Sequence, residues 1–293
     1  MISIAITSFK EPKTIGRAIN AFLNQNLSNY ELIVSAPDKE TLDAAKVYAR
    51  KNKRIKIIQD AGKGKPAALN KIFKIAKGKI IILSDGDVFV SNNSISEITR
   101  PFIDSAVGAV TGKVVSTNSK KNMFGYWAHI LTSGFHNLRK IEAKKGKEVA
   151  CSGYLYAIRK GIVKQIPEDI LADDAFISME IIKKGYKTKY AEKAEVYVRY
   201  PDNLPDWIKQ KKRTAGRFYQ LNKYFKISKS ESLRDEVFAG ARTIFKINSP
   251  KQLLWFFSLS IMRVYIWFRV FFDFRLWNRS FKKTWQRVES TKS

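Results

Sequence analysis

The chain has 293 residues and a formal net charge of +28 at pH 7, because 54 Lys and Arg stand against 26 Asp and Glu. A hydrophobic content of 45% excludes a disordered polycation, and the length is sufficient for one large domain with an additional segment. One cysteine and two histidines exclude a disulfide scaffold and a zinc module.

The first hundred residues alternate between short apolar runs and segments of helical periodicity. We expect strands at residues 2–6, 31–35, 55–59 and 80–83, with helices between them. Pro66 suits the first turn of the third helix. The run Ile80 to Leu83 is apolar at every position, as a parallel strand covered on both faces requires. This half therefore predicts a doubly wound nucleotide-binding sheet.

The residues that follow the last of these strands are Ser84, Asp85, Gly86 and Asp87. Open α/β sheets bind ligands at the carboxyl ends of their strands. Two carboxylates at this place can hold a hard divalent cation, which can bridge the phosphates of a nucleotide diphosphate. The competing interpretation is an ordinary acidic turn after a strand.

The middle of the chain changes its pattern. We expect a strand at 107–115, a mixed aromatic and basic segment at 122–147, and a strand near 154–158. A helix at 175–184 closed by a glycine follows, then strand, turn and strand over 186–198, and a basic helix over 206–224. The histidines His129 and His136 are assigned to packing and receive no functional role.

Residues 253–272 are apolar or aromatic except for two serines and two arginines, and this length matches a bilayer span. Arg263 lies near the centre, where an arginine costs about 2.5 to 3.5 kcal/mol in an inserted helix. A helix in the membrane interface, a short span and a helix buried against the body all remain open. The basic and aromatic residues that follow favour an anionic membrane surface over nucleic acid. They are Arg275, Trp277, Arg279, Lys282, Lys283, Trp285 and Arg287.

Over residues 1–215 the sequence resembles the inverting family 2 glycosyltransferases, which have the GT-A fold. The opening segment from Ile4 to Glu11 is similar to the first strand and turn of the family. The resemblance implies that Thr7, Phe9 and Glu11 lie near the base and ribose of the donor, and that Asp38 accepts a hydrogen bond from the base.

The segment Gly62 to Asn70 resembles the family's loop between the third strand and its helix. Its glycines, its lysines and the helix N-terminus make an anion site, to which Gly62 and Lys65 contribute. The alternative is a solvated basic turn. Together with Asp85, these residues form the predicted nucleotide-sugar site, and Asp87 and Asp85 form the predicted metal site.

The pair Asp173 and Asp174 falls where the family carries two acids, the second of which is the general base. The resemblance therefore implies that Asp174 takes the proton of the acceptor hydroxyl and that Asp173 supports it. Acidic residues are also favoured at helix starts, so the capping interpretation competes.

Residues Gln210 to Thr214 are similar to the Gln-x-x-Arg-Trp motif of processive family members. The resemblance implies that Gln210 and Arg213 lie at the acceptor or the diphosphate. Ser152 and Gly153 resemble the family's loop of small residues under the acceptor, and the competing interpretation is a tight turn before a strand. The tryptophan of the motif is replaced by Thr214, which argues for transfer of one or a few sugars.

The predicted fold class is α/β, a GT-A type doubly wound mixed sheet with helices on both faces and a C-terminal basic, aromatic-rich helical membrane-associating region. We expect a glycosyltransferase domain at residues 1–225, with a nucleotide-binding half (1–100) and an acceptor half (101–225), and a tail at 226–293. The expected cofactor is Mn²⁺ or Mg²⁺.

The expected partners are a UDP- or GDP-linked sugar donor, a lipid-linked or glycan acceptor, and an anionic membrane surface. The N-terminus lacks the features of a signal peptide, so we expect the cytoplasmic face of a membrane. The main alternative is a degenerate protein that binds a polyanion or nucleic acid. A sugar nucleotidyltransferase fits poorly, since residues 7–14 contain no glycine to approach a triphosphate.

Overall fold

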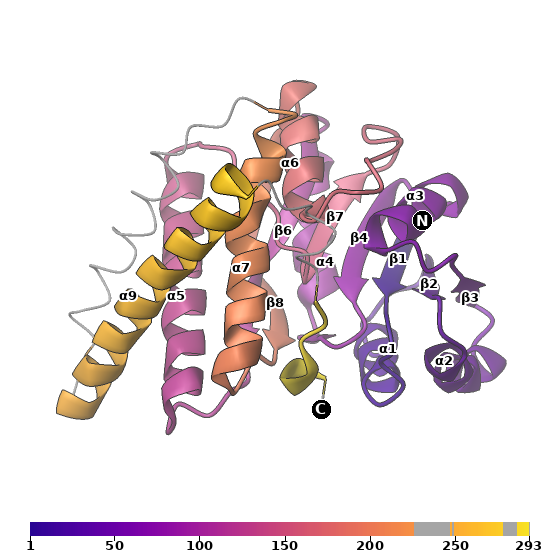
Figure 1. The fold of residues 1–293 in the computed structure, drawn as a ribbon. Helices are drawn as coiled ribbons and strands as arrows, with labels where there is room; N and C mark the ends of the chain where they lie inside the picture. Colours follow the sequence, from indigo (N-terminus) through magenta and orange to yellow (C-terminus); the bar gives the residue numbers. More distant parts are fainter. Residues whose placement is uncertain (226–246, 248, 278–285, 293) are drawn as a thin grey trace. The chain divides into compact units, whose positions relative to one another are not determined.

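The computed structural model describes residues 1–225, 247, 249–277 and 286–292 (Figure 1). Arg279, Lys282, Lys283 and Trp285 of the predicted polybasic segment lie outside the described residues. The chain forms two compact units. The first comprises Met1–Val114, Lys140–Val198 and Lys292, and the second comprises Val115–Arg139 and the described residues between Arg199 and Thr291.

The first unit is built on a mixed sheet with strand order β3-β2-β1-β4-β7-β6-β8-β5. Strands β3, β2, β1 and β4 pair in parallel, whereas β7 runs antiparallel to β4 and β6. The strands are β1 (Ile2–Thr7), β2 (Tyr30–Ala36), β3 (Ile55–Gln59), β4 (Ile80–Asp85), β5 (Phe89–Val90), β6 (Val107–Ser116), β7 (Leu155–Arg159) and β8 (Lys187–Val198).

The four strands predicted in the first hundred residues are β1 to β4, and they are confirmed with small extensions at their ends. Strand β4 reads Ile-Ile-Ile-Leu-Ser-Asp, and its residues from Ile81 to Ser84 are buried. The all-apolar run thus occupies the interior of the sheet, and the first carboxylate of the predicted metal motif ends the strand.

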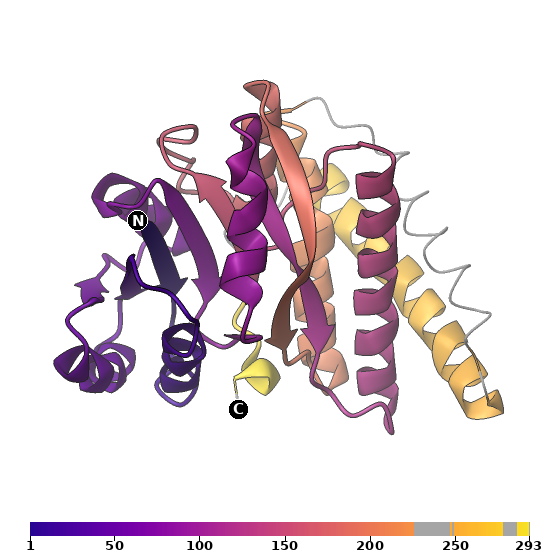
Figure 2. The ribbon, with the colours of Figure 1, turned by 180° about the vertical axis from the view of Figure 1, so that it is seen from behind.

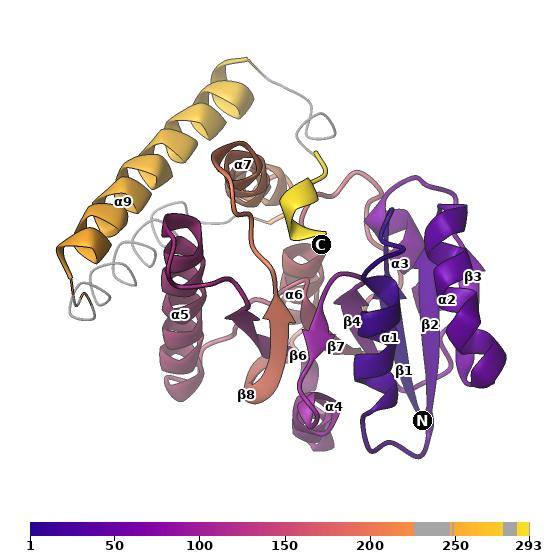
Figure 3. The same ribbon diagram turned by 90° about the horizontal axis from the view of Figure 1, so that it is seen from below.

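Helices cover both faces of this sheet, as a doubly wound fold requires. Helices α1 and α2 lie side by side (Figure 3). Helix α6 lies on one face of the central strands and α4 on the other, which Figures 1 and 2 show from opposite sides. The helices are α1 (Ile15–Leu23), α2 (Lys39–Lys51), α3 (Lys65–Ile75), α4 (Ser94–Thr99) with the 3-10 turn η1 (Arg100–Ile103), and α6 (Asp173–Lys183).

Three sequence expectations are corrected in the middle of the chain. The mixed segment at 122–147 is mostly one helix, α5 (Met123–Lys144), whose aromatic residues pack in the second unit. Residues 187–198 form one unbroken strand, because no glycine or proline interrupts them. Helix α6 begins at Asp173, so both aspartates belong to its first turn rather than preceding it.

The second unit is helical. Helix α9 (Pro250–Phe271) packs on α7 (Leu204–Leu221) and on the first part of α5 (Figure 1). Trp127 and Trp207 are buried in the core with ring centroids 5.0 Å apart, and Trp127 Nε1 donates to the carbonyl of Trp255 at 2.7 Å. The π-helical turn η3 (Phe272–Leu276) and the 3-10 turn η5 (Glu289–Thr291) complete the described part of this unit.

Candidate active site

The site is built at the carboxyl edge of the parallel strands in the first unit. Thr7, at the end of β1, pairs in register with Asp85, at the end of β4. The carbonyl of Thr7 accepts a hydrogen bond from the N–H of Gly86 at 3.0 Å. Neighbouring strand ends thereby bring together residues that are about eighty positions apart in sequence.

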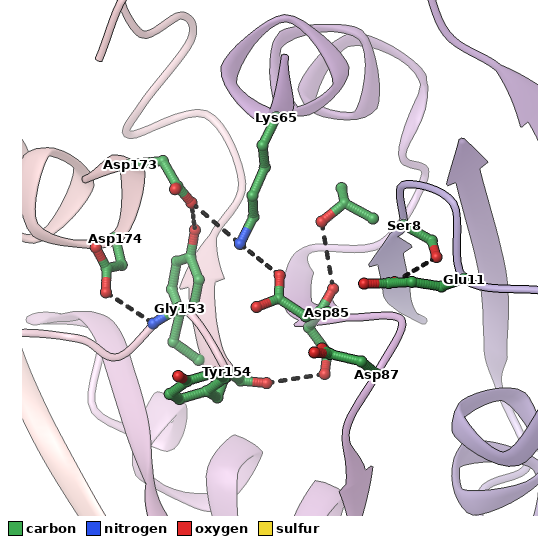
Figure 4. A network of polar contacts seen from close by, with 12 residues as sticks. Ser8, Glu11, Lys65, Asp85, Asp87, Gly153, Tyr154, Asp173 and Asp174 are labelled. Carbon is green, nitrogen blue, oxygen red and sulfur yellow. Dashed lines mark hydrogen bonds and ion pairs between the residues drawn. The ribbon is translucent and has the colours of Figure 1, made fainter. Parts of the chain in front are cut away.

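Lys65, the first residue of α3, links two of the predicted acids (Figure 4). Its Nζ lies 2.7 Å from Asp85 Oδ1 and 3.5 Å from Asp173 Oδ2. Burial alone would lower the pKa of Lys65, but Asp173 and Asp85 outweigh burial and raise it, so Lys65 stays charged. In this structure the ammonium group therefore neutralises carboxylates from two separate parts of the chain.

Asp173, the second acid in contact with Lys65, is buried, and the hydroxyl of Tyr156 lies 3.4 Å from its Oδ2. Burial raises the pKa of Asp173 to about 6; Asp174 adds to the increase and Lys65 opposes it. Burial also raises the pKa of Tyr156 well above its usual value, so the phenol keeps its proton and donates a hydrogen bond to the carboxylate. Asp173 is thus ionised at neutral pH but close to its titration range.

Asp174 points to the loop before β7 instead of to Lys65. Its Oδ2 accepts a hydrogen bond from the N–H of Gly153 at 2.8 Å (Figure 4). A Cβ at Gly153 would lie 3.5 Å from that oxygen and 3.6 Å from Lys65 Nζ. Ser152 is buried, and its N–H donates to Thr111 Oγ1 at 3.0 Å. The predicted loop of small residues therefore contacts the predicted general base.

Glu11 and Asp87 both form ion pairs with the ammonium group of Lys292. Lys292 Nζ lies 2.6 Å from Asp87 Oδ2 and also forms an ion pair with Glu11 Oε1. Ser8 Oγ donates to Glu11 Oε2 at 2.6 Å. Burial raises the pKa of Glu11 to about 7; Asp87 adds to the increase and Lys292 opposes it.

The residues predicted near the base lie beside this group. The N–H of Lys10 donates to Asp38 Oδ2 at 2.8 Å, and the N–H of Thr41 donates to Asp38 Oδ1 at 3.0 Å. Asp38 therefore caps α2 and fixes the turn after β1, where Phe9 is 37% exposed. Gly62 has a φ of +67°, a left-handed conformation that favours glycine, and its N–H donates to Asp60.

Gln210 and Arg213 lie on α7, in the second unit. Gln210 is buried, and among the described residues its Oε1 has no hydrogen-bond partner. Thr214, which replaces the tryptophan of the motif, donates its hydroxyl to the carbonyl of Gln210 at 3.0 Å. The assignment of Gln210 and Arg213 to the acceptor or the diphosphate stays a prediction.

The donor atoms of this site fit a hard divalent cation. In the described part of the chain, no group of three or more His, Cys, Asp or Glu side chains is arranged to hold a metal ion by itself. Glu11 and Asp87 nevertheless hold one ammonium group between them, so their oxygens can share a cation. Carboxylate oxygens are the ligands that Mg²⁺ uses together with substrate phosphates.

Sequence reasoning missed Ser8, Tyr156 and Lys292 as members of the site. Ser8 and Glu11 are three residues apart in the turn after β1, and this short separation could have indicated their contact. No local pattern marks Tyr156 or Lys292, because only the sheet and the chain path bring them to the acids.

Comparison with known proteins identifies the family of this chain. A family model described as "Glycosyltransferase like family 2" matches residues 1–216. The probable glycosyltransferase YdaM of Bacillus subtilis is 25% identical over 80% of this chain and 60% of its own length. The poly-beta-1,6-N-acetyl-D-glucosamine synthase of Staphylococcus aureus is 24% identical over 78% of this chain and 58% of its own length.

Among solved structures, the mannosyltransferase PcManGT from Pyrobaculum calidifontis, in complex with GDP-Man and Mn²⁺, matches with a TM-score of 0.69. The match has 17% identity and covers 94% of this chain and 87% of that one, so it shows the fold. The mixed sheet with its helices is a GT-A fold, as the sequence predicted.

The chain belongs to glycosyltransferase family 2 and carries a glycosyltransferase domain of that family. It spans less than two thirds of the length of the two curated relatives named above.

Proposed function

We propose that this protein is a metal-dependent, inverting glycosyltransferase that moves a sugar from a UDP- or GDP-linked donor to a lipid-linked or membrane-proximal acceptor. The observation that carries the proposal is the ion pair of Lys65 with both Asp85 and Asp173. It holds an acid from the predicted donor site beside an acid from the predicted base site. A transfer reaction needs these two functions within reach of one sugar carbon.

On the donor side, Asp85 and Asp87, with Glu11 beside Asp87, would hold a divalent cation together with phosphate oxygens of the donor. When bound, this cation would stabilise the negative charge of the leaving diphosphate. Phe9 offers an exposed ring near the turn fixed by Asp38, where a base could stack. The structural neighbour PcManGT was solved with GDP-Man and Mn²⁺, which supports this proposal.

On the acceptor side, Asp174 would take the proton of the attacking hydroxyl. The N–H of Gly153 fixes one of its oxygens at 2.8 Å, which orients the carboxylate. Asp173, held by Lys65 and Tyr156, would keep the ammonium group of Lys65 close to the reacting centre. Attack from the face opposite the diphosphate would invert the configuration of the sugar carbon.

The proposed acceptor lies at a membrane, and an apolar helix supports this part of the proposal. Among the described residues, one helix, Pro250–Leu276, is long and apolar enough to cross a membrane, with a mean hydropathy of 1.4. Its residues Phe256, Leu259, Ile266 and Val270 are buried in the core of the second unit. Another set is exposed by 55% or more: Leu254, Phe257, Ile261, Val264 and Phe268.

This division between a buried and an exposed apolar face supports a helix in the membrane interface. One face packs on α5 and α7, and the other is available to acyl chains. A complete span would require the buried face to leave the core that contains Trp127 and Trp207. We therefore propose attachment to the cytoplasmic face of a membrane through the exposed face of α9.

The mechanism predicts that Asp85→Asn and Asp174→Asn each reduce sugar transfer by about 10²- to 10⁴-fold, the range typical of a lost acid or base. The assay uses purified full-length protein, UDP- and GDP-linked sugars, Mn²⁺ and a membrane extract as acceptor, and it follows release of the nucleotide diphosphate. Glu40→Gln, an exposed acid on α2, is the matched control and should keep full activity. Wild-type activity in either aspartate variant would disprove the mechanism.

The donor class is tested separately by thermal unfolding with UDP, GDP and their sugar conjugates, each with and without Mn²⁺. A ligand present at a hundred times its dissociation constant adds about 2.7 kcal/mol of stability. Stabilisation by one nucleotide family that depends on Mn²⁺ would identify the donor. No shift with any nucleotide, together with salt-sensitive binding of nucleic acid, would favour the polyanion-binding alternative.

A further inference from the structure

The ammonium group of Lys292 lies between two buried carboxylates, Asp87 of the predicted metal site and Glu11 of the predicted nucleotide-sugar site. Its Nζ lies 2.6 Å from Asp87 Oδ2 and forms an ion pair with Glu11 Oε1. The exposed fractions of the three side chains are 19% for Lys292, 5% for Glu11 and 9% for Asp87. An ion pair this far removed from water is held in one place, unlike a surface pair.

Neutral groups hold both the carboxylate and the backbone of Glu11 in place. Ser8 Oγ donates to Glu11 Oε2 at 2.6 Å, and the N–H of Glu11 donates to Thr41 Oγ1 at 2.8 Å. Gly86 leaves the space for this arrangement, since a Cβ there would lie 2.3 Å from Ser8 Oγ and 2.7 Å from Glu11 Oε2. Glu11 Oε1 and Asp87 Oδ2 are thus the two oxygens presented to the cation.

Charge balance decides what else could bind these oxygens. Lys292 brings one positive charge to two buried acids, whereas a divalent cation would neutralise both. Mn²⁺ and Mg²⁺ also bind carboxylate oxygens directly and bring coordination sites for phosphate oxygens. The ammonium group and the metal ion therefore require the same two atoms and cannot hold them at the same time.

We propose that Lys292 is a tethered cation that occupies the metal position of the donor site and is displaced when the divalent metal binds. It is thus a residue that determines how much metal the enzyme requires before the donor can bind. The inference rests on the metal site of the proposed function, and it concerns a residue 205 positions away from Asp87 in sequence.

The test measures binding of Mn²⁺ alone, by calorimetry and by the electron paramagnetic resonance signal of free Mn²⁺, with no sugar donor present. Lys292→Ala should bind Mn²⁺ about tenfold more tightly than wild type, because the competing cation is gone. Lys292→Arg keeps the charge and should stay close to wild type. Lys164→Ala, an exposed lysine of the first unit, is the control and should leave binding unchanged.

A second readout needs no variant. Amine-labelling of wild-type protein, followed by mass spectrometry, should modify Lys292 slowly without metal and several-fold faster with Mn²⁺. Labelling of Lys164 should not respond to the metal. Labelling of Lys292 that is fast without metal, or that does not change with Mn²⁺, would overturn the inference.

Asp87→Asn separates this inference from the proposed function. If Asp87→Asn loses Mn²⁺ binding while Lys292→Ala binds it no more tightly than wild type, the metal site stands and the role of Lys292 is wrong. If Asp87→Asn binds Mn²⁺ as wild type does, the metal site itself is wrong. Absence of Mn²⁺ binding in every variant, also with GDP or UDP added, would reject both.

Discussion

Lys65 and Lys292 show how the acids of this site are neutralised at the level of single residues. Each ammonium group lies between two carboxylates: Lys65 between Asp85 and Asp173, and Lys292 between Asp87 and Glu11. Buried carboxylates without such partners would raise the free energy of the folded state by several kcal/mol. The two aspartates of the predicted metal motif are thus paired with different cations.

The titration of Asp173 gives a prediction about stability. In the folded chain its pKa is raised, mainly by burial, from 3.8 to about 6. Between these pH values the folded chain binds more protons than the unfolded chain, so this group's contribution to the unfolding free energy falls as pH rises and is constant above about 6. The shift corresponds to about 3 kcal/mol.

Asp173→Asn removes this titration. Relative to wild type, the variant should therefore gain up to about 3 kcal/mol of stability between pH 4 and pH 8. Urea unfolding of both proteins at the two pH values measures the change. An equal stability difference at both values would show that the carboxyl of Asp173 is not perturbed by burial.

The sequence points to the acids of the candidate site through motifs, but it does not show which cations pair with them. Asp85, Asp87, Asp173 and Asp174 stand at strand and helix ends, where a motif can be read from neighbouring residues. Lys65 was predicted as a contact to phosphate, yet in the structure it binds two of these acids. Lys292 had no local signal, since no motif around it marks a contact with Glu11 or Asp87.

At the level of secondary structure, prediction was reliable where burial of the whole element determined its hydrophobic pattern. Strands β1, β2 and β4 are buried along almost their whole length, and such burial favours apolar residues on both faces of a strand. Helix α5 was not predicted, because its apolar and aromatic residues are mixed with polar and basic ones and give no clear helical periodicity. The residues of strand β8 were predicted as strand, turn and strand, since the polar residues in the middle of this segment resemble a turn between two short runs.

Packing of the helices in the second unit depends on Trp127. The side chain is 1% exposed, contacts Trp207, and donates a hydrogen bond to the carbonyl of Trp255 on α9. Trp127→Ala should destabilise the protein by about 3 to 5 kcal/mol, the usual cost of removing a large buried aromatic ring. Trp277→Ala, at a position 55% exposed, should cost much less. Equal effects in thermal unfolding would show that Trp127 does not hold these helices together.

Across the whole molecule, the net charge of +28 contrasts with the acidic groups gathered in the first unit. A basic protein attracts anionic ligands and anionic membranes at long range. A site rich in carboxylates repels a diphosphate at short range unless cations neutralise those carboxylates. The two properties are compatible if the positive surface recruits the protein and its donor while the metal and the lysines neutralise the site.

Membrane attachment through α9 is tested with the full chain. Phe257→Glu and Ile261→Glu, both on the exposed face of the helix, should weaken binding to phosphatidylglycerol vesicles at least tenfold. Each change removes about 1.5 to 3 kcal/mol of apolar transfer and adds a negative charge. Ile103→Glu is the matched control, because Ile103 is 90% exposed in the first unit and should leave binding unchanged.

Co-sedimentation at low and high salt measures vesicle binding, and alkaline carbonate then distinguishes an interfacial helix from a span. We expect binding to phosphatidylglycerol to exceed binding to phosphatidylcholine and to decrease with salt, because basic side chains contribute to it. Carbonate should release the protein, since one face of α9 stays packed on α5 and α7. Retention after carbonate would indicate a span, and vesicle binding unaffected by both glutamate variants would place the contact elsewhere.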